Sequence, residues 1–333
     1  MWRRGSAGLA LWLAVVAAQA ETLRIATFNT ELSRAGPGLF LRDLGRDAPD
    51  IDYVLERIAD VGADVWVLQS MDYDADLLAL SAFAERAGYP HIFALPPNSG
   101  LRTGLDLNGD GETGTPQDAQ GYGAFSGQDG MAILSRYPVR AEADLSDLIW
   151  AELPWATLPT KEDGAPFPSA EAWAVQRLST TGHWRVALEL GGVELTLLTA
   201  HSGTPAFDGP EDRNGLRNAD ELRLVGKMLD EVEGPAVVVG NFNLDPQAGD
   251  GRRGAMVDFL ANPRLQDALA GQDTVDFERS DVGRLRVSYV LPTADLEIVD
   301  ADVAWQDRPP PQGDTRFTRH HPVWVELRVP PAP

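Results

Sequence analysis

The stretch that most constrains the fold of this 333-residue chain is the run 237–239 and the loop that follows it. Three consecutive valines are typical of a strand buried on both faces. Gly240 is expected to let the backbone turn where this strand ends, and the loop then presents two asparagines, Asn241 and Asn243. In α/β folds, polar side chains at the carboxyl end of a core strand commonly carry the chemistry, although the same residue types also form ordinary turns. The stretch alone leaves both interpretations open.

Apolar periodicity predicts an α/β domain. Strands are expected at 23–28, 65–68, 91–95, 131–134, 184–190, 193–199, 237–239, 285–291, 296–304 and 322–329. Helices are expected at 51–61, 75–87, 222–232 and 254–260. Strand and helix alternate in the first hundred residues, which indicates a sheet covered by helices. The glycine pair 191–192 predicts a hairpin between the two strands around it. Without an internal repeat or a linker, residues 21–333 are expected to form one domain.

The first twenty residues have the pattern of a secretory signal peptide. Arg3 and Arg4 precede an apolar run at 9–16, and the alanines at 18 and 20 form an A-x-A cleavage site. We therefore expect cleavage near Ala20 and a secreted or periplasmic bacterial protein. The chain has no cysteine, so its stability is expected not to depend on disulfides. No second apolar run reaches membrane-spanning length, and we expect no membrane contact.

The charge balance argues against one class of partner. The formal net charge is -22, and such an acidic surface repels polyanions at long range. General nucleic-acid binders usually carry the opposite charge. A bound metal ion reverses the sign locally, so the charge argues against a grip on long nucleic acid more than against phosphate chemistry.

Several predicted strands end in a side chain that is able to contact a metal or a phosphate. These residues are Asn29, Gln69, His201, Asn241, Asn243 and His320. Each one alone is an ordinary turn or packing residue. Their repetition over several strands favours a common site at one edge of the sheets.

Seven short motifs occur in order along the chain. They are IATFN at 25–29, DVWVLQ at 64–69, GMAILSR at 130–136, TAH at 199–201, GNFN at 240–243, RVSYVL at 286–291 and HHPV at 320–323. On these motifs the chain resembles the endonuclease/exonuclease/phosphatase superfamily, the relatives of pancreatic deoxyribonuclease and exonuclease III. The resemblance implies a four-layered α-β-β-α sandwich of two packed mixed sheets, with the site at one sheet edge.

The resemblance also implies hydrolysis of a small phosphoester or of nucleic acid with Mg²⁺ or Mn²⁺. Family catalytic positions correspond to His201, Asn241, Asn243 and His320. Arg319 is expected to bind phosphate, because an arginine beside a catalytic histidine contacts phosphate bidentately. The residues expected near the catalytic metal are Asn29, Gln69 and Asp72.

Four family acidic positions are substituted. They are occupied by Ser70, Asn241, Ser288 and Arg319. Neutral amides and hydroxyls bind Mg²⁺ weakly, and an amide does not act as a base. We expect hydrolysis to be weakened or lost, although Asp72 or Asp74 reaching back into the site would offset the substitution at Ser70. The alternative is a phosphate-binding or calcium-stabilised structural protein without catalysis on the same fold.

A separate calcium loop is predicted inside the glycine- and aspartate-rich insertion at 97–129. The DLNGDG sequence at 106–111 has the oxygen spacing of an EF-hand-type loop, with Gly111 at the sharp turn. The expected ligands are Asp106, Asn108, Asp110, the Glu112 carbonyl and Asp118. A solvated acidic turn is the alternative. Bound Ca²⁺ is expected to order the insertion rather than to take part in chemistry.

Overall fold

The computed structural model describes residues 22–277, 282–305 and 317–329, so the expected signal peptide lies outside the described residues. The strands are β1 (Thr22–Asn29), β2 (Val65–Met71), β3 (His91–Phe93), β4 (Gly130–Ser135), β5 (Val139–Asp144), β6 (Gly182–Leu190), β7 (Val193–His201), β8 (Ala236–Asn241), β9 (Val275–Phe277), β10 (Gly283–Leu285), β11 (Ser288–Pro292), β12 (Glu297–Val303) and β13 (Val323–Arg328). The helices are α1 (Leu39–Leu44), α2 (Pro49–Val61), α3 (Leu78–Ala87), α4 (Ala170–Trp173), α5 (Arg213–Asp230) and α6 (Arg253–Leu260).

Two mixed sheets form the centre of the molecule. One has the order β12-β13-β1-β2-β4-β3, and the other has the order β11-β8-β7-β6-β5. Each contains one parallel pair, β1 with β2 and β7 with β8, among antiparallel neighbours. The predicted hairpin is present as β6 and β7, which pair across residues 191 and 192. Strands β9 and β10 form a small separate ribbon.

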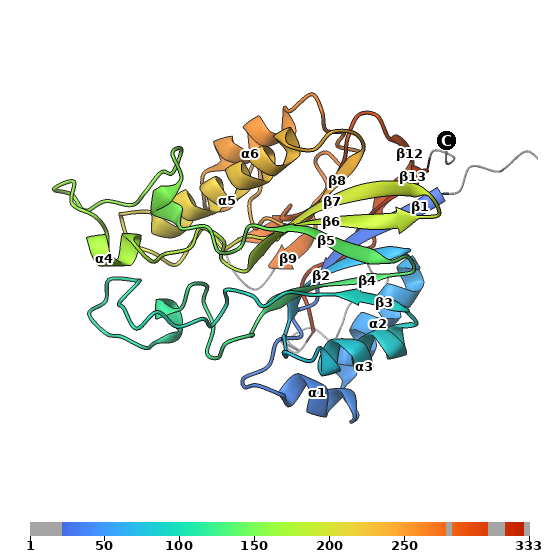
Figure 1. The fold of residues 1–333 in the computed structure, drawn as a ribbon, viewed down its shortest axis with the longest axis horizontal. Helices are drawn as coiled ribbons and strands as arrows, with labels where there is room; N and C mark the ends of the chain where they lie inside the picture. The colour runs from blue at the N-terminus through green and yellow to red at the C-terminus, as the bar shows by residue number, and fades with distance from the viewer. Residues whose placement is uncertain (1–21, 278–281, 306–316, 330–333) are drawn as a thin grey trace, which may run out of the picture.

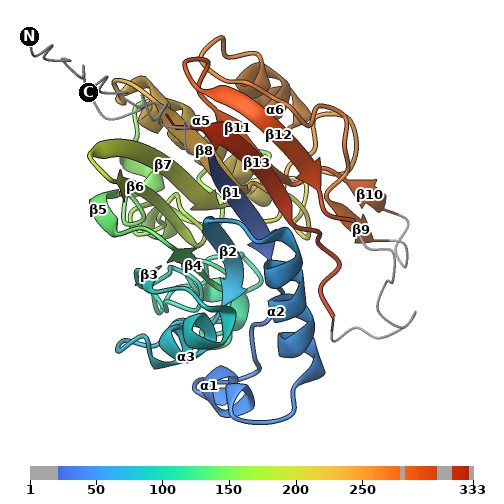
Figure 2. The same cartoon turned by 90° about the vertical axis from the view of Figure 1, so that its right-hand side faces the viewer.

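Helices cover the outer face of each sheet. Figure 1 shows α5 and α6 above the sheet that contains β8, and α1, α2 and α3 below the sheet that contains β2. Figure 2 shows that β12 and β13 extend the sheet that contains β2 beyond β1. The expected four-layered α-β-β-α sandwich is therefore confirmed.

The core between the sheets is built by the period-two alternation of strand side chains. Ile25 and Val67 from one sheet pack in the same apolar cluster as Val186 and Val237 from the other. The opposite faces pack on helices, as Trp66 does among α2 and α3 and Val238 does beneath α5. Both sheets thus bury both faces, which explains the uninterrupted apolar runs in β2 and β8.

Some boundaries differ from the sequence-based expectation. Helix α5 begins at Arg213, nine residues before the predicted start at 222, and α3 begins at Leu78 rather than 75. The insertion at 97–129 is irregular as expected, apart from a 3-10 turn at Pro116–Asp118. Among the described residues, no helix is both long and apolar enough to span a membrane.

Candidate functional site

The pleat of β8 decides where the two asparagine side chains point. Val237 and Val239 lie in the core between the two sheets, so Asn241, two residues further along the strand, faces the same interlayer. Gly240 has a different role from the expected turn. It lies within β8 without a positive φ, and a Cβ there would stand 2.2 Å from the Ala200 carbonyl oxygen. The backbone turns instead at Asn243, whose φ is 51°.

Strand register places three site residues side by side. His201 at the end of β7 is paired with Asn241, and Asn241 is paired with Ser288 at the start of β11. Neighbours in register project from the same face of a sheet, so all three point into the interlayer. The structure therefore brings together residues that lie 40 or more positions apart in the sequence.

The loop after β8 is held by its own amides. The Asn241 side-chain oxygen accepts a hydrogen bond from the Asn243 backbone N–H at 3.0 Å. The Asn243 side-chain nitrogen donates to the Ser202 carbonyl at 2.8 Å, which ties the loop to the end of β7. These bonds fix both amides, and they leave the Asn241 Nδ2 buried without a hydrogen-bond partner among the described residues.

His320 enters the site from the segment before β13. It is 5% exposed, and its ring lies edge-on to Phe277 at a centroid distance of 6.1 Å. Burial lowers the pKa of His320 to about 4, with Arg319 and His201 adding to the effect and Glu31 opposing it. The imidazole is therefore neutral near pH 7 and donates through only one of its nitrogens.

Arg319 is paired with Glu31. The guanidinium donates to both Glu31 carboxylate oxygens, and the Arg319 backbone N–H donates to the same carboxylate at 2.7 Å. Burial raises the pKa of Glu31, but the interactions with His320 and Arg319 outweigh it and hold that pKa below its usual value. The arginine expected to bind phosphate thus lies at the site with its charge neutralised by a neighbour.

His201 has a carboxylate neighbour of its own. Burial lowers the pKa of His201, and the charge of Asp129 opposes that shift. Burial raises the pKa of Asp129, although His201 and a hydrogen bond from the Ser70 side chain act in the opposite direction. Ser70 occupies a family acidic position, and its hydroxyl donates a hydrogen bond to the carboxylate of Asp129, the residue just before β4.

The expected metal-proximal residues are placed differently from one another. The Asn29 side chain turns back to accept the Glu31 backbone N–H at 3.2 Å. Gln69 points into the sheet interior, where its amide is engaged by Thr27 and Val67. Gln69 therefore offers no free group to the site.

The acidic replacements suggested for the lost ligand are engaged elsewhere. Asp72 accepts hydrogen bonds from the Ser33 hydroxyl and from the backbone amides of Arg34 and Asp129. Asp74 accepts the amides of Leu78 and Ala79 and so begins α3. Both carboxylates brace loops, which corrects the idea that either reaches back to replace Ser70.

The donor set does not fit a catalytic divalent metal. Within the described residues, no three His, Asp or Glu side chains form an arrangement that holds a metal ion. Mg²⁺ needs carboxylate ligands, whereas the Glu31 carboxylate is paired with Arg319 and the Asp129 carboxylate accepts a hydrogen bond from Ser70. The amide of Asn241 and the hydroxyl of Ser288 carry no charge.

Glu31 and Asp129 are the site residues that the sequence-based prediction missed. Both lie just beyond an end of a strand. Asp129 precedes the interlayer residue Met131 by two positions, and Glu31 follows Asn29 by two positions. Both residues have a positive φ, 48° for Glu31 and 57° for Asp129, so the period-two alternation of an extended strand does not predict where their side chains point.

The predicted calcium loop is folded on its own hydrogen bonds. Asp106 accepts the backbone amides of Gly109 and Gly111 at 2.6 and 2.9 Å. Asn108 donates to Asp110, and Asp110 also accepts the Glu112 amide, all on an exposed surface. The last expected ligand, Asp118, is joined to the loop through the protein itself: its carboxylate accepts the amides of Leu107 and Thr115 and the Thr115 hydroxyl.

Comparison with known proteins agrees with this architecture. The model of the Endonuclease/Exonuclease/phosphatase family matches residues 26–320. An endonuclease/exonuclease/phosphatase from Beutenbergia cavernae is 19% identical, with a TM-score of 0.59 over 94% of this chain and 72% of that one. Sphingomyelinase C from Streptomyces griseocarneus is 17% identical, with a TM-score of 0.51 over 92% of this chain and 99% of that one. D. rerio TDP2, in complex with a single-strand DNA product, is 13% identical, with a TM-score of 0.54 over 92% of this chain and 99% of that one. No curated protein matches the chain by sequence.

Proposed function

This chain belongs to the endonuclease/exonuclease/phosphatase family, and we propose that it binds small phosphoesters at the shared edge of its two sheets while family-type hydrolysis is weakened or lost. Family members are generally nucleases, phosphodiesterases and phosphatases that depend on divalent metals. Here the site keeps neutral donors for phosphate oxygens, namely the amides of Asn241 and Asn243 and the imidazoles of His201 and His320. The net charge of -22 favours small esters over long nucleic acid.

One observation carries this proposal. His320 Nδ1, Ser288 Oγ and Asn241 Nδ2 are buried, and none has a hydrogen-bond partner among the described residues. A catalytic imidazole needs an acceptor on its second nitrogen to fix its tautomer and to stabilise its charged form. Neither Ser288 nor Asn241 supplies that acceptor to His320. The unpaired amide of Asn241 is instead a donor, which suits binding of an anionic oxygen and not removal of a proton from water.

The test compares the native protein with a variant that restores two acids, Asn241→Asp with Ser288→Asp. Both are assayed with Mg²⁺ or Mn²⁺ on bis-p-nitrophenyl phosphate and on plasmid DNA. We expect the restored variant to hydrolyse these substrates about two to four decades faster than the native protein. This is the range of rate that removal of an orienting acid costs in other hydrolases. Inorganic phosphate binding, measured by calorimetry, is expected for the native protein and is expected to weaken in Asn243→Ala.

Two controls separate the outcomes. His201→Ala in the restored background checks that the new activity arises at this site. Circular dichroism of each variant checks that it is folded. A native rate equal to that of the restored variant would contradict weakened hydrolysis, and native protein that binds no phosphate would contradict the binding function.

We also propose that the loop at 106–112 binds Ca²⁺ and thereby stiffens the insertion. The support is the oxygen-rich spacing of Asp106, Asn108 and Asp110 on one exposed loop. Ligand binding to the folded state raises the melting temperature. We expect a higher melting temperature in millimolar Ca²⁺ than in chelator, and no such difference in Asp106→Asn with Asp110→Asn.

Export is the third proposal, and it rests on the sequence at 1–20. Expression of the full chain in a bacterium, followed by mass spectrometry of the periplasmic and cytoplasmic fractions, tests it. We expect a periplasmic protein that begins at Glu21. A protein that remains in the cytoplasm with its first twenty residues intact would overturn the proposal.

A further inference from the structure

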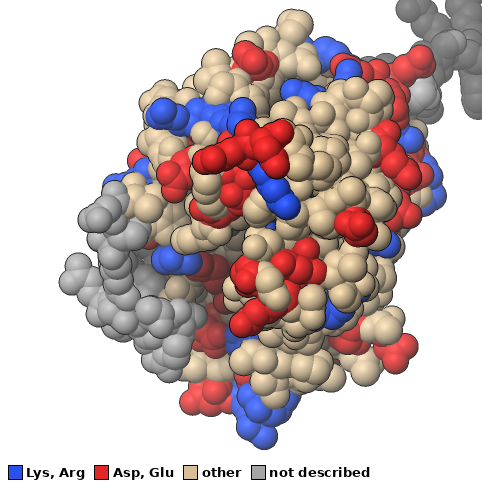
Figure 3. All heavy atoms as spheres, turned by 90° about the vertical axis from the view of Figure 1, so that its left-hand side faces the viewer, with Lys and Arg blue, Asp and Glu red and all other residues tan. Residues whose placement is uncertain are grey.

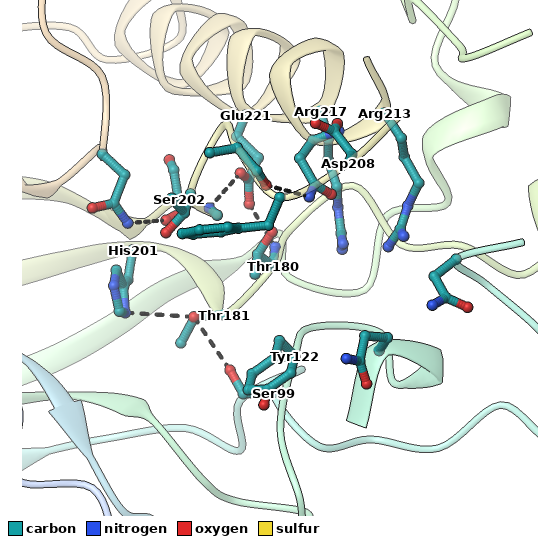
Figure 4. A pocket seen from close by; sticks show the side chains of 18 of the residues that line it. Ser99, Tyr122, Thr180, Thr181, His201, Ser202, Asp208, Arg213, Arg217 and Glu221 are labelled. Atoms are coloured by element: carbon teal, nitrogen blue, oxygen red, sulfur yellow. Dashed lines mark hydrogen bonds between the residues drawn. The ribbon is translucent and has the colours of Figure 1, made fainter. Parts of the chain in front are cut away.

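A cavity of about 600 Å³ opens beside His201 and Asn243 and continues away from the sheets. Its far walls come from three segments that lie mostly outside the proposed phosphate site. These are the insertion at 97–129, the segment 202–209 after β7, and the first turns of α5. Figure 4 shows side chains of all three meeting around one space, with His201 at one side of it. The insertion is thus a wall of the site.

Two buried charged residues of α5 build the frame of this cavity. Arg217 donates to the carbonyls of Leu178, Gln120 and Ser179 and so joins the insertion to the segment before β6. Glu221 accepts the amides of Thr180 and Gly203. Because these bonds are internal to the protein, the walls are preformed, as in most small-molecule sites.

Arg213 is the group that points to a ligand. It lies one helical turn before Arg217 on the same face of α5, and both side chains extend from the helix toward the cavity in Figure 4. The Nε of Arg213 is buried, and it has no hydrogen-bond partner among the described residues. Burial also lowers the pKa of Arg213, against the opposing charges of Asp208 and Glu211. A buried donor without a partner costs free energy that a ligand acceptor removes.

The lining chemistry selects the class of ligand. Asp208 and Glu211 line the cavity and disfavour a second anionic group. The presence of Arg213 and Arg217 disfavours a cationic group. Carboxylates, amides and guanidinium together match hydroxyl groups, which donate and accept hydrogen bonds at the same time. Tyr122, which is 65% exposed, adds an aromatic face for an apolar ring surface.

We propose that this cavity holds the alcohol part of the phosphoester, and that this part is a neutral, hydroxyl-rich group such as a sugar or polyol. The inference rests on the proposed phosphate site, because the phosphate end must lie at His201 and Asn243. Arg213 donates to a ligand hydroxyl from α5, and Tyr122 packs on the ligand from the insertion. The insertion then sets substrate choice while the sheet edge holds the phosphate.

Calorimetry with three probes tests the proposal on the full protein. The probes are inorganic phosphate, glucose 1-phosphate and phosphocholine. We expect glucose 1-phosphate to bind at least ten-fold more tightly than the other two. Arg213→Met and, separately, Tyr122→Ala are each expected to weaken glucose 1-phosphate about ten-fold and to leave inorganic phosphate unchanged. Lys227→Met, which removes a charge from the solvent side of the same helix, is the matched control and is expected to change neither.

The outcomes distinguish this inference from the proposed function. Equal affinity for inorganic phosphate and glucose 1-phosphate, or a preference for phosphocholine, would overturn the cavity assignment and leave the phosphate site standing. Absence of binding by all three probes would overturn both. The Arg213→Met protein, if folded by circular dichroism, is expected to lose this preference. A preference for glucose 1-phosphate that stays ten-fold would show that Arg213 does not contact the ligand.

Discussion

At the scale of single residues, His183 makes the free energy of unfolding depend on pH. It is fully buried, with Nδ1 2.7 Å from the Ser179 hydroxyl and Nε2 3.1 Å from the Glu221 carbonyl oxygen. Burial lowers the pKa of His183 to about 4, with Arg217 adding to this and the Glu221 carbonyl opposing it. The unfolded chain titrates near 6.5, so between these two values it binds a proton that the folded chain excludes. The stabilisation is complete above pH 6.5 and is lost as the pH falls toward 4.

We predict that this histidine makes the protein acid-sensitive. A shift of this size corresponds to about 3 kcal/mol of the free energy of unfolding between pH 7 and pH 4. In His183→Gln, that pH dependence is expected to become smaller by a comparable amount. Urea unfolding of the native and variant proteins at several pH values measures it. Parallel curves for the two proteins would show that His183 does not contribute.

Glu31 and Arg319 yield a second prediction at this scale. The ion pair holds the guanidinium away from a bound phosphate, so Glu31→Gln is expected to raise the affinity for inorganic phosphate about ten-fold, or about 1.4 kcal/mol. Calorimetry measures the change. The double variant Glu31→Gln with Arg319→Gln is the control and is expected to lose the gain. Weaker binding by Glu31→Gln would mean that the carboxylate itself supports the site.

At the scale of elements, apolar periodicity predicted the buried strands well because both faces of each sheet are covered. It missed β5, whose residues are mostly exposed at the edge of its sheet. It also missed the start of α5, where buried Arg217, Asp220 and Glu221 replace the expected apolar face. The burial of these charged side chains depends on hydrogen bonds to carbonyls and amides of distant loops. A local sequence pattern therefore does not predict it.

Gly240 provides a test of how closely β7 and β8 pack. Because an added Cβ would meet the Ala200 carbonyl oxygen at 2.2 Å, Gly240→Ala is expected to reduce the free energy of unfolding by about 3 kcal/mol. It is also expected to disturb His201 and Asn241, which follow on the two strands. Gly254→Ala in α6 is the matched control, since no atom lies within 4 Å of its added Cβ, and it is expected to be stabilising by about 0.5 kcal/mol. Urea unfolding compares the two, and equal effects would show that the close approach is relaxed in solution.

At the scale of the whole molecule, the location of the site was more predictable than its chemistry. Strand ends and motif order placed His201, Asn241 and His320 at one edge, and the structure brings them together. Whether a carboxylate there is free depends on contacts made across the molecule. Glu31 is paired with Arg319, 288 residues away, and these distant partners decide whether the edge carries negative charge.

The surface charge is the remaining whole-molecule property, and it acts on stability as well as on partners. Figure 3 shows acidic side chains gathered on the end of the molecule that carries the insertion. With a net charge of -22, these groups repel one another more strongly in the folded chain than in the expanded one. The Debye length, over which charges interact through salt solution, falls from about 30 Å at 0.01 M salt to about 8 Å at 0.15 M.

We therefore predict that the melting temperature rises by a few degrees over this range of NaCl and changes little above it. Scanning calorimetry in NaCl measures the rise, and sucrose solutions of equal osmolality control for solvent effects that do not involve charge. A melting temperature independent of NaCl would mean that local ion pairs already balance the acidic surface.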